Sequence, residues 1–553
     1  MKTLLIKLVD EAIRRANRQG LLKSETAAFT IEAPRDPAHG EAACNAALVL
    51  ARLESKPPRA IAEIIVEQIE RGPELADVAI AGAGFINFRM AREYWLQELR
   101  EIARSDGGFW RPGLSAGGRV QVEFLSANPT GPLTVGHGRN AVLGDTLSRL
   151  LETVGYQVTR EYYFNNGGRQ MKLLSESVRA RYLQELGREA SLPDEGYQGQ
   201  YIKEIAASLV RQYRDGLLSA GDGEVFRAEA ERAIFADILG TCKRLGISFD
   251  VFSNENDLVS KGFVDAVIEA LNARGLTVER EGALWLSSEK VGLPNQQDVV
   301  LRRSSGEPTY RTPDIAYHIE KLKRGFDQII GVFGADHIAE HEGVIAAVKA
   351  LGYDTSPFRA IIYQFVTLTR GGEKVKMSTR RATYVTLDEL IDEVGADVVR
   401  FFFLFRKSDS QLDFDIELAK RQAPENPVFY IQYAHARLAS VFREAAKAGF
   451  DHPLDPVGVN LDLLASEELE LIKRMAAYPE LICDAAVALE PHRIAFFLLE
   501  LAGGFHRYYN KPSNRIISED RELSAARLLW AQVLRDCIAS GLTVLGVRAP
   551  ERM

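Results

Sequence analysis

The hydrophobic pattern divides the chain into three stretches of different character. Up to about residue 112, helical periodicity over Ala42–Leu53 and Pro58–Glu70 mixes with strand-like patterns, which predicts a small α+β domain. From about 119 to 423, apolar runs alternate with helical segments, as in an α/β domain with a parallel sheet. From about 424 to 553 the pattern is almost wholly helical and predicts a helical bundle.

Within the middle stretch, four apolar runs are predicted to be strands. They are Gln121–Leu125, Asp298–Arg303, Gln328–Gly334 and Arg359–Val366. Between the first run and the other three, residues of about 172–285 are mostly charged and carry no motif. We expect them to form a helical insertion between two halves of the sheet. A Gly/Ser-rich linker, Gly113–Gly118, precedes the whole stretch.

Composition narrows the class of protein. A length of 553 residues favours several domains, and a net charge of −8 disfavours non-specific binding of nucleic acid by the overall field. Local basic patches can still bind RNA. The four cysteines form no C-x-x-C pair, and there is no signal peptide and no apolar run of roughly 18 residues. We therefore expect a cytoplasmic protein without a membrane span.

A Pro/Gly turn connects the strand at 121–125 to a helical run expected over Arg139–Leu151, and it includes Thr134-Val-Gly136-His137. Gly136 has no Cβ, so a nucleotide can approach the backbone closely. A helix N-terminus offers free N–H groups to phosphate. His137 can donate to negative charge developing on an α-phosphate, and Thr134 can bond a phosphate oxygen without carrying charge.

The longer segment Ser126–His137 resembles the HIGH element of class I aminoacyl-tRNA synthetases, in the form found in arginyl-tRNA synthetases. One difference is Thr134, where that family usually has histidine. The resemblance implies an α/β fold: a Rossmann-like class I catalytic domain with a helical insertion, an N-terminal α+β appended domain that contacts tRNA, and a C-terminal all-α anticodon-binding bundle.

A glycine-flanked basic loop, Gly371–Arg381, follows a strand-like run and resembles the KMSKS loop of class I synthetases. Mobile cations there would stabilise the pyrophosphate leaving group. Thr379 replaces the second lysine of the motif, and Arg380 and Arg381 follow it. The resemblance assigns phosphate contacts to Lys376 and Ser378, and ATP contacts to Met377 and Arg380.

The segment Gly334-Ala-Asp336-His337 follows an apolar strand and resembles the ribose-binding element of class I enzymes, with Asp336 and His337 holding the sugar. A rival interpretation is zinc, because His337–His341 spells H-x-x-E-H. No third ligand is evident, so we expect no protein-bound metal.

Recognition of arginine would rest on acidic and polar groups, because a guanidinium binds planar, paired acceptors. Tyr310 and Asp314 match the family's Tyr-x-x-x-Asp segment that reads the guanidinium. Glu123 and Asn128 match positions of the amino-acid pocket, where Asn128 would fix the backbone end of arginine.

Asn426–Arg437 is similar to the opening of the arginyl-tRNA synthetase anticodon-binding bundle. Aromatic and cationic side chains suit unstacked bases and phosphates, so we expect tRNA contacts from Tyr433, Arg437, Arg507 and Tyr508. The alternative for each aromatic residue is an ordinary core position.

Taken together, the resemblance implies a monomeric enzyme that joins L-arginine to arginine tRNA with ATP and Mg²⁺. Two other classes stay open. A small-molecule nucleotidylyltransferase could carry T-x-G-H, but it needs neither the basic loop nor the helical bundle. A non-catalytic tRNA-binding paralogue is suggested by Thr134 and Thr379.

Overall fold

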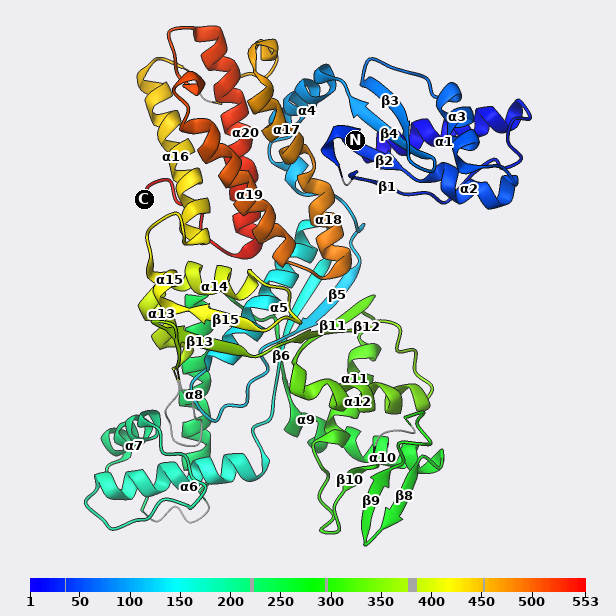
Figure 1. The fold of residues 1–553 in the computed structure, drawn as a ribbon. Coiled ribbons are helices and arrows are strands. Elements are labelled where there is room, and N and C mark those ends of the chain that lie inside the picture. Colours follow the sequence, from blue (N-terminus) through cyan, green and yellow to red (C-terminus); the bar gives the residue numbers. More distant parts are fainter. Residues whose placement is uncertain (35, 219–222, 294–296, 376–384, 451–452) are drawn as a thin grey trace. The chain divides into compact units, whose positions relative to one another are not determined.

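A computed structural model describes residues 1–34, 36–218, 223–293, 297–375, 385–450 and 453–553, which form two compact units (Figure 1). The first unit comprises residues 1–109, 441–477 and 507–536, and the second comprises 110–440, 478–506 and 537–553. The three predicted domains, 1–112, 119–423 and 424–553, remain predictions.

The first unit contains a four-stranded antiparallel sheet of order β1-β2-β4-β3. Helix α1 buries Leu5, Val9, Ala12, Ile13 and Ala16, the single apolar face expected of an amphipathic helix. The elements of this unit are α1 Lys2–Arg18, β1 Ile31–Glu32, β2 Ala42–Cys44, α2 Ala46–Glu54, α3 Pro58–Gln68, β3 Leu75–Ala81, β4 Phe85–Met90, α4 Arg92–Arg104 and α17 Ser466–Ala476.

The helix predicted over Ala42–Leu53 was wrong at its start. Ala42–Cys44 forms strand β2, and α2 begins only at Ala46. The pairing of Ala42 with Phe88 and of Cys44 with Ile86 gives these small residues buried places in the sheet. Tertiary pairing therefore outweighs the local helical pattern.

The second unit is built on a five-stranded parallel sheet of order β12-β11-β5-β6-β7. Its strands are β5 Arg119–Glu123, β6 Gln157–Phe164, β7 Val251–Asn254, β11 Gln328–Gly334 and β12 Phe358–Tyr363. Strand β5 lies at the centre, with Val122 opposite Ile330 on one side and Arg160 on the other. Val120 and Val122 are fully buried, as expected of a parallel strand covered on both faces.

The order of these strands creates a switch in direction. From β5 the chain proceeds outward through β6 to β7, and it then returns to the other side of β5 to form β11 and β12. Open parallel sheets bind ligands at the carboxyl ends of the strands at such a switch point. The ends of β5 and β11 therefore mark the place for a site.

The predicted helical insertion over about 172–285 is only partly helical. It contains α6 Gly168–Glu185, α7 Gln200–Tyr213 and α8 Glu224–Arg244, but strand β7 in the same range belongs to the parallel sheet. Strands β8 Thr277–Arg280 and β9 Ala283–Leu286 pair with β10 Val299–Arg302 in a separate antiparallel sheet.

The second unit also contains a small three-stranded sheet and further helices. A small sheet of order β14-β13-β15 contains β13 Val366–Arg370, β14 Glu373–Lys374 and β15 Leu412–Asp415. The remaining helices are α5 Val135–Thr153, α9 Glu255–Ser260, α10 Phe263–Ala273, α11 Arg311–Lys323, α12 Ile338–Ala350, α13 Leu387–Val394, α14 Ala396–Leu404, α15 Ile416–Lys420 and α18 Tyr478–Ala488.

The C-terminal stretch is helical, as predicted. Helices α16 Pro427–Lys447, α19 His492–Tyr509 and α20 Arg521–Leu545 each supply residues to both units. By length and composition α20 is the one helix among the described residues that could cross a membrane, and 67% of its apolar window is buried within the protein.

Candidate active site

The switch point is held together by one side chain of α5. Asn140 accepts a hydrogen bond from the main-chain N–H of Leu125, just after β5, at 2.5 Å. Its amide nitrogen donates to the carbonyl of Val332 in β11 at 2.9 Å. Asn140 is buried, so these bonds fix the N-terminal part of α5 against the ends of the two central strands.

Helix α5 begins at Val135, four residues earlier than predicted, so Gly136 and His137 lie in its first turn. Thr134 is the N-cap, and its main-chain N–H donates to Nδ1 of His137 at 3.1 Å. This bond is one half of a capping box. Burial lowers the pKa of His137, so the ring is neutral near pH 7 and its proton lies on Nε2.

The turn between β5 and α5 has an unusual backbone. Leu125 and Ser126 both have positive φ, 66° and 45°, although neither is glycine. Such a backbone conformation costs of order 1–3 kcal/mol for each residue, and it persists only where neighbouring contacts hold it in place. Here the surroundings are the Asn140 bond to Leu125 and a bond from the N–H of Tyr163 to the Ser126 hydroxyl at 3.2 Å.

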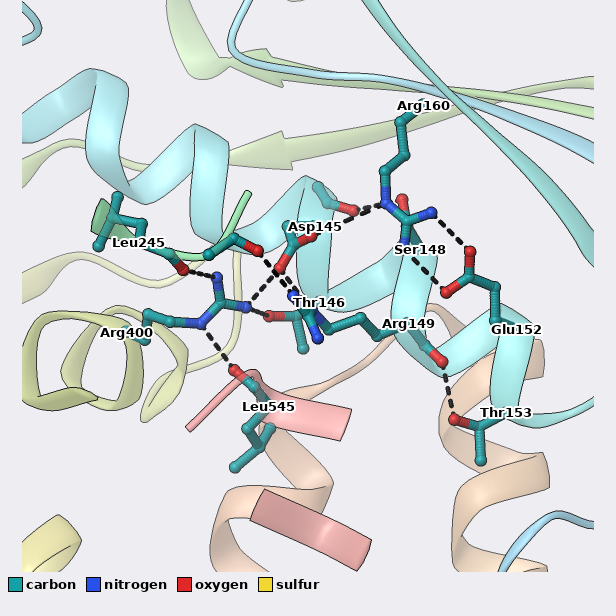
Figure 2. Close-up of polar contacts among 12 residues, drawn as sticks. Asp145, Thr146, Ser148, Arg149, Glu152, Thr153, Arg160, Leu245, Arg400 and Leu545 are labelled. Atoms are coloured by element: carbon teal, nitrogen blue, oxygen red, sulfur yellow. Dashed lines mark hydrogen bonds and ion pairs between the residues drawn. The ribbon is translucent and has the colours of Figure 1, made fainter. Parts of the chain in front are cut away.

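Two buried arginines, one within α5 and one in α14, anchor α5 to its surroundings. Arg139 donates to the carbonyls of Gln364, Lys407 and Ser410, and burial lowers its pKa to about 10. Figure 2 shows Arg400 of α14 beside α5, where it pairs with Asp145 at 2.6 Å. The guanidinium also donates to the carbonyls of Leu245, the C-cap residue directly after α8, and of Leu545, the last residue of α20.

The predicted arginine-binding residue Glu123 already holds a cation of the chain. Its carboxylate pairs with Lys321 of α11, and both side chains are buried. Glu123 also accepts a hydrogen bond from Ser126 at 3.2 Å. Lys321 lies seven residues after Asp314, so the two share one face of α11.

Asp314 is the most strongly perturbed carboxyl of the site. Burial raises its pKa to about 8, with further contributions from the neighbouring carboxylates of Glu255, Glu123 and Glu340. Within the described part of the chain, Asp314 makes no salt bridge. A carboxyl of this kind favours a cationic ligand, because a bound cation relieves the repulsion.

Sequence reasoning did not single out Glu255. It begins α9 directly after β7 and accepts hydrogen bonds from Tyr163 at 3.2 Å and from the amide of Asn165 at 2.7 Å. Burial raises the pKa of Glu255. No spacing in the sequence links it to Asp314; only the adjacency of β6, β7 and α11 brings the carboxylates together.

The other two predicted arginine-binding residues are exposed. Asn128 accepts a hydrogen bond from the N–H of Asn165 at 2.9 Å. Tyr310 is the N-cap residue of α11, and its hydroxyl donates to Glu340 of α12 at 3.2 Å.

The predicted ribose element lies at the end of β11. Gly334 ends the strand, and Asp336 and His337 form a short 3₁₀ turn before α12. The His337 ring contacts Glu340 at 2.8 Å, whereas the half-buried His341 ring packs against Phe333. Among the described residues no group of three or more His, Cys, Asp and Glu could hold a metal.

The basic loop falls largely outside the described residues. Lys376, Met377, Ser378, Thr379, Arg380 and Arg381 all lie there. The chain re-enters the described region beside the T-x-G-H turn, where the N–H of Leu387 donates to the carbonyl of Leu133 at 2.8 Å. Thr386 and Thr134 also form an isolated β-bridge.

The predicted tRNA contacts differ in exposure. In the second unit, Tyr433 is 38% exposed, and the Arg437 guanidinium lies 4.5 Å from the centre of its ring. In the first unit, Arg507 is exposed, but Tyr508 is only 2% exposed. The Tyr508 hydroxyl donates to buried Glu468 at 2.7 Å, so Tyr508 presents no ring surface to a base here.

Three sequence families match the chain. They are "Arginyl tRNA synthetase N terminal domain" over residues 3–90, "tRNA synthetases class I (R), catalytic domain" over 107–401 and "DALR anticodon binding domain" over 431–553. A protein named arginine–tRNA ligase from Desulfotalea psychrophila is 46% identical over 95% of both chains. Another of that name from Salinibacter ruber is 47% identical, also over 95% of both.

The fold agrees with these matches. The structure of Thermus thermophilus arginyl-tRNA synthetase superposes with a TM-score of 0.75 at 24% identity, covering 99% of this chain and 100% of that one. The parallel sheet with a T-x-G-H turn at its switch point is that of a class I aminoacyl-tRNA synthetase, a fold that uses ATP. Within this class, the chain belongs to the arginyl-tRNA synthetase family.

Proposed function

We propose that the crevice at the ends of β5 and β11 activates L-arginine with ATP and transfers it to arginine tRNA. The observation that carries this proposal is the meeting, at one switch point, of an acidic pocket around Asp314 with a neutral His137 at a helix N-terminus. The first group suits a guanidinium, and the second suits a phosphate.

The arginine side chain would be read by carboxylates. Asp314 is the primary partner, because its carboxyl is the most strongly perturbed of the pocket and makes no salt bridge among the described residues. Glu123 would contribute less to binding of the arginine side chain, because its carboxylate is already paired with Lys321. Tyr310 borders the pocket, and Asn128 would hold the backbone end of the amino acid.

ATP would lie over the first turn of α5. Gly136 leaves room for the nucleotide, Thr134 can bond a phosphate oxygen, and His137 donates from Nε2 to the α-phosphate. Gly334, Asp336 and His337 would hold the ribose. ATP is expected as its Mg²⁺ complex, since phosphate oxygens supply ligands that this ion prefers.

The chemistry has two steps and needs no protein nucleophile. The arginine carboxylate attacks the α-phosphorus, the bond to the bridging oxygen breaks, and pyrophosphate leaves. Lys376, Ser378, Met377 and Arg380 of the basic loop would stabilise this leaving group. A hydroxyl of the terminal adenosine then attacks the carbonyl, and AMP leaves. The chain supplies orientation and charge stabilisation.

Binding of tRNA would involve the C-terminal helices, with exposed Tyr433 and Arg507 and half-buried Arg437 as candidates. Tyr508 would first have to leave the core. The N-terminal α+β region would add contacts to tRNA. We further propose a monomer that acts in the cytoplasm.

The test is ATP–pyrophosphate exchange with each of the twenty amino acids, with and without arginine tRNA. The family resemblance also implies that arginine activation needs bound tRNA. We therefore expect exchange with arginine and with no other amino acid, and only when arginine tRNA is present. Exchange with a different amino acid would overturn the substrate assignment. Tight tRNA binding without any exchange would instead favour a non-catalytic paralogue.

A further inference from the structure

One carboxylate lies between the two substrate subsites of the proposed reaction. Glu340, in the first turn of α12, accepts a hydrogen bond from the Tyr310 hydroxyl with Oε1 at 3.2 Å. Its other oxygen, Oε2, contacts Nδ1 of His337 at 2.8 Å. Tyr310 borders the arginine pocket, and His337 belongs to the ribose element.

Arg311 holds the same carboxylate in place. Its guanidinium donates to the main-chain carbonyl of Glu340 at 2.9 Å and lies 3.7 Å from Oε1. The guanidinium also lies 5.7 Å from the centre of the Tyr310 ring. Four groups from the start of α11 and the start of α12 therefore form one connected network.

The charge of Glu340 also reaches the arginine pocket. Burial by itself would raise the pKa of Glu340, but hydrogen bonding from His337 and the charge of Arg311 outweigh it and lower the pKa overall. The carboxylate is therefore ionised near neutral pH, and its charge is one of those that raise the pKa of Asp314.

We infer that Glu340 is a positioning residue that couples arginine binding to ATP binding. Tyr310 and His337 are both more than half exposed, so each side chain keeps rotational freedom while its subsite is empty. A substrate that orders one of them orders Glu340, and Glu340 then presents a fixed partner to the other. The second substrate then binds to a subsite that is already ordered, so its binding loses less conformational entropy.

This inference rests on the proposed function, and binding measurements separate the two. L-arginine is titrated by calorimetry into the full chain, alone and saturated with a non-hydrolysable ATP analogue. In the unsubstituted chain the analogue should tighten the arginine Kd at least about fivefold, the lower end of usual coupling between sites. In E340Q that factor should fall below about twofold, while the Kd for arginine alone changes less than about threefold.

Glu269→Gln is the matched control, because Glu269 is an exposed carboxylate on α10, and it should keep the full coupling. Tyr310→Phe removes only the hydroxyl and should lower the coupling as E340Q does. Unchanged coupling in E340Q, or independent binding in the unsubstituted chain, overturns the inference and leaves the proposed function standing. Failure to bind arginine at all overturns the proposed function itself.

Discussion

The main-chain N–H of Thr134 donates to Nδ1 of His137, and this bond decides which ring nitrogen is left to contact a ligand. Because Nδ1 is occupied as an acceptor, the neutral ring carries its proton on Nε2. His137 can then act as a hydrogen-bond donor without being charged.

His137→Ala should lower kcat for tRNA-dependent exchange by about 10²–10³-fold, the usual cost of removing one donor to a developing charge. The KM for arginine should change little, because the lost contact is to phosphate. His137→Gln keeps an N–H donor and should recover part of the rate. Steady-state exchange kinetics measure both quantities, and a rate within threefold of the unsubstituted chain in His137→Ala would contradict the role.

Asp314→Asn should weaken the binding of arginine by about 1.5–3 kcal/mol, the range for a hydrogen bond to a charged group. ATP binding should be retained. The arginine KM in exchange and the Kd by calorimetry measure the effect. Glu269→Gln removes a carboxylate on α10 and should leave both values unchanged; an unaltered arginine KM in Asp314→Asn would refute the assignment.

Arginine affinity should depend on pH through Asp314, whose pKa is about 8 in the free protein. The guanidinium stays charged throughout and prefers the ionised carboxylate, so binding releases a proton. The Kd should therefore improve as pH rises toward 8 and level off above it, with roughly tenfold weaker binding per pH unit below 8. Calorimetry between pH 6 and 9 tests this, and the dependence should vanish in Asp314→Asn.

Arg400→Met should destabilise the protein by about 3–5 kcal/mol, because it leaves Asp145 buried after the loss of one charged partner (Figure 2). Arg149 and Arg160 also approach Asp145, which places the effect toward the lower end of that range. Urea unfolding measures the change. Arg232→Ala breaks an exposed ion pair with Glu229 and should leave the stability almost unchanged. Equal effects of the two substitutions would rule out a special role for Arg400.

Gly144→Ala should destabilise the protein by about 1–3 kcal/mol, since a Cβ there would stand 2.1 Å from the Phe124 ring. Gly240→Ala is the matched change, because Gly240 lies within α8 and has nothing within 4 Å of a new Cβ. It should stabilise the protein by about 0.5–1 kcal/mol. Thermal unfolding of both variants gives the comparison, and stabilisation by Gly144→Ala would show that Phe124 moves aside freely.

The sequence predicted those elements whose signal is local. The run Gln328–Gly334 is almost continuously apolar, and it forms β11 with the predicted bounds. Strand β7 was missed because it has four residues, and its side chains are mostly half-buried rather than alternating. The start of α5 was placed too late because Thr134–His137 was taken for a loop, whereas a capping box makes it the first turn of the helix.

The candidate site could be predicted only where a motif marks it. Lys321 and Glu255 belong to no motif, and Glu340 stood out only as the glutamate of the H-x-x-E-H pattern. Their partners Glu123, Tyr163 and Tyr310 lie 198, 92 and 30 residues away in the sequence. Such pairs arise from the order of strands in the sheet, which no single-sequence pattern reveals. The burial of Tyr508 could not be predicted either. The sequence pattern of an aromatic residue beside cations is the same in a protein core and on a tRNA-binding surface.

The side-chain oxygen of Asn140 accepts from the backbone just after β5, and its nitrogen donates to the backbone of β11. No other side chain of that length both accepts and donates at its tip, so aspartate would lose the bond to Val332 and leucine would lose both. The sheet consequently cannot part along the seam between β5 and β11 while both bonds last. We therefore expect any movement during turnover to occur in the segments around β5 and β11, while these two strands stay paired.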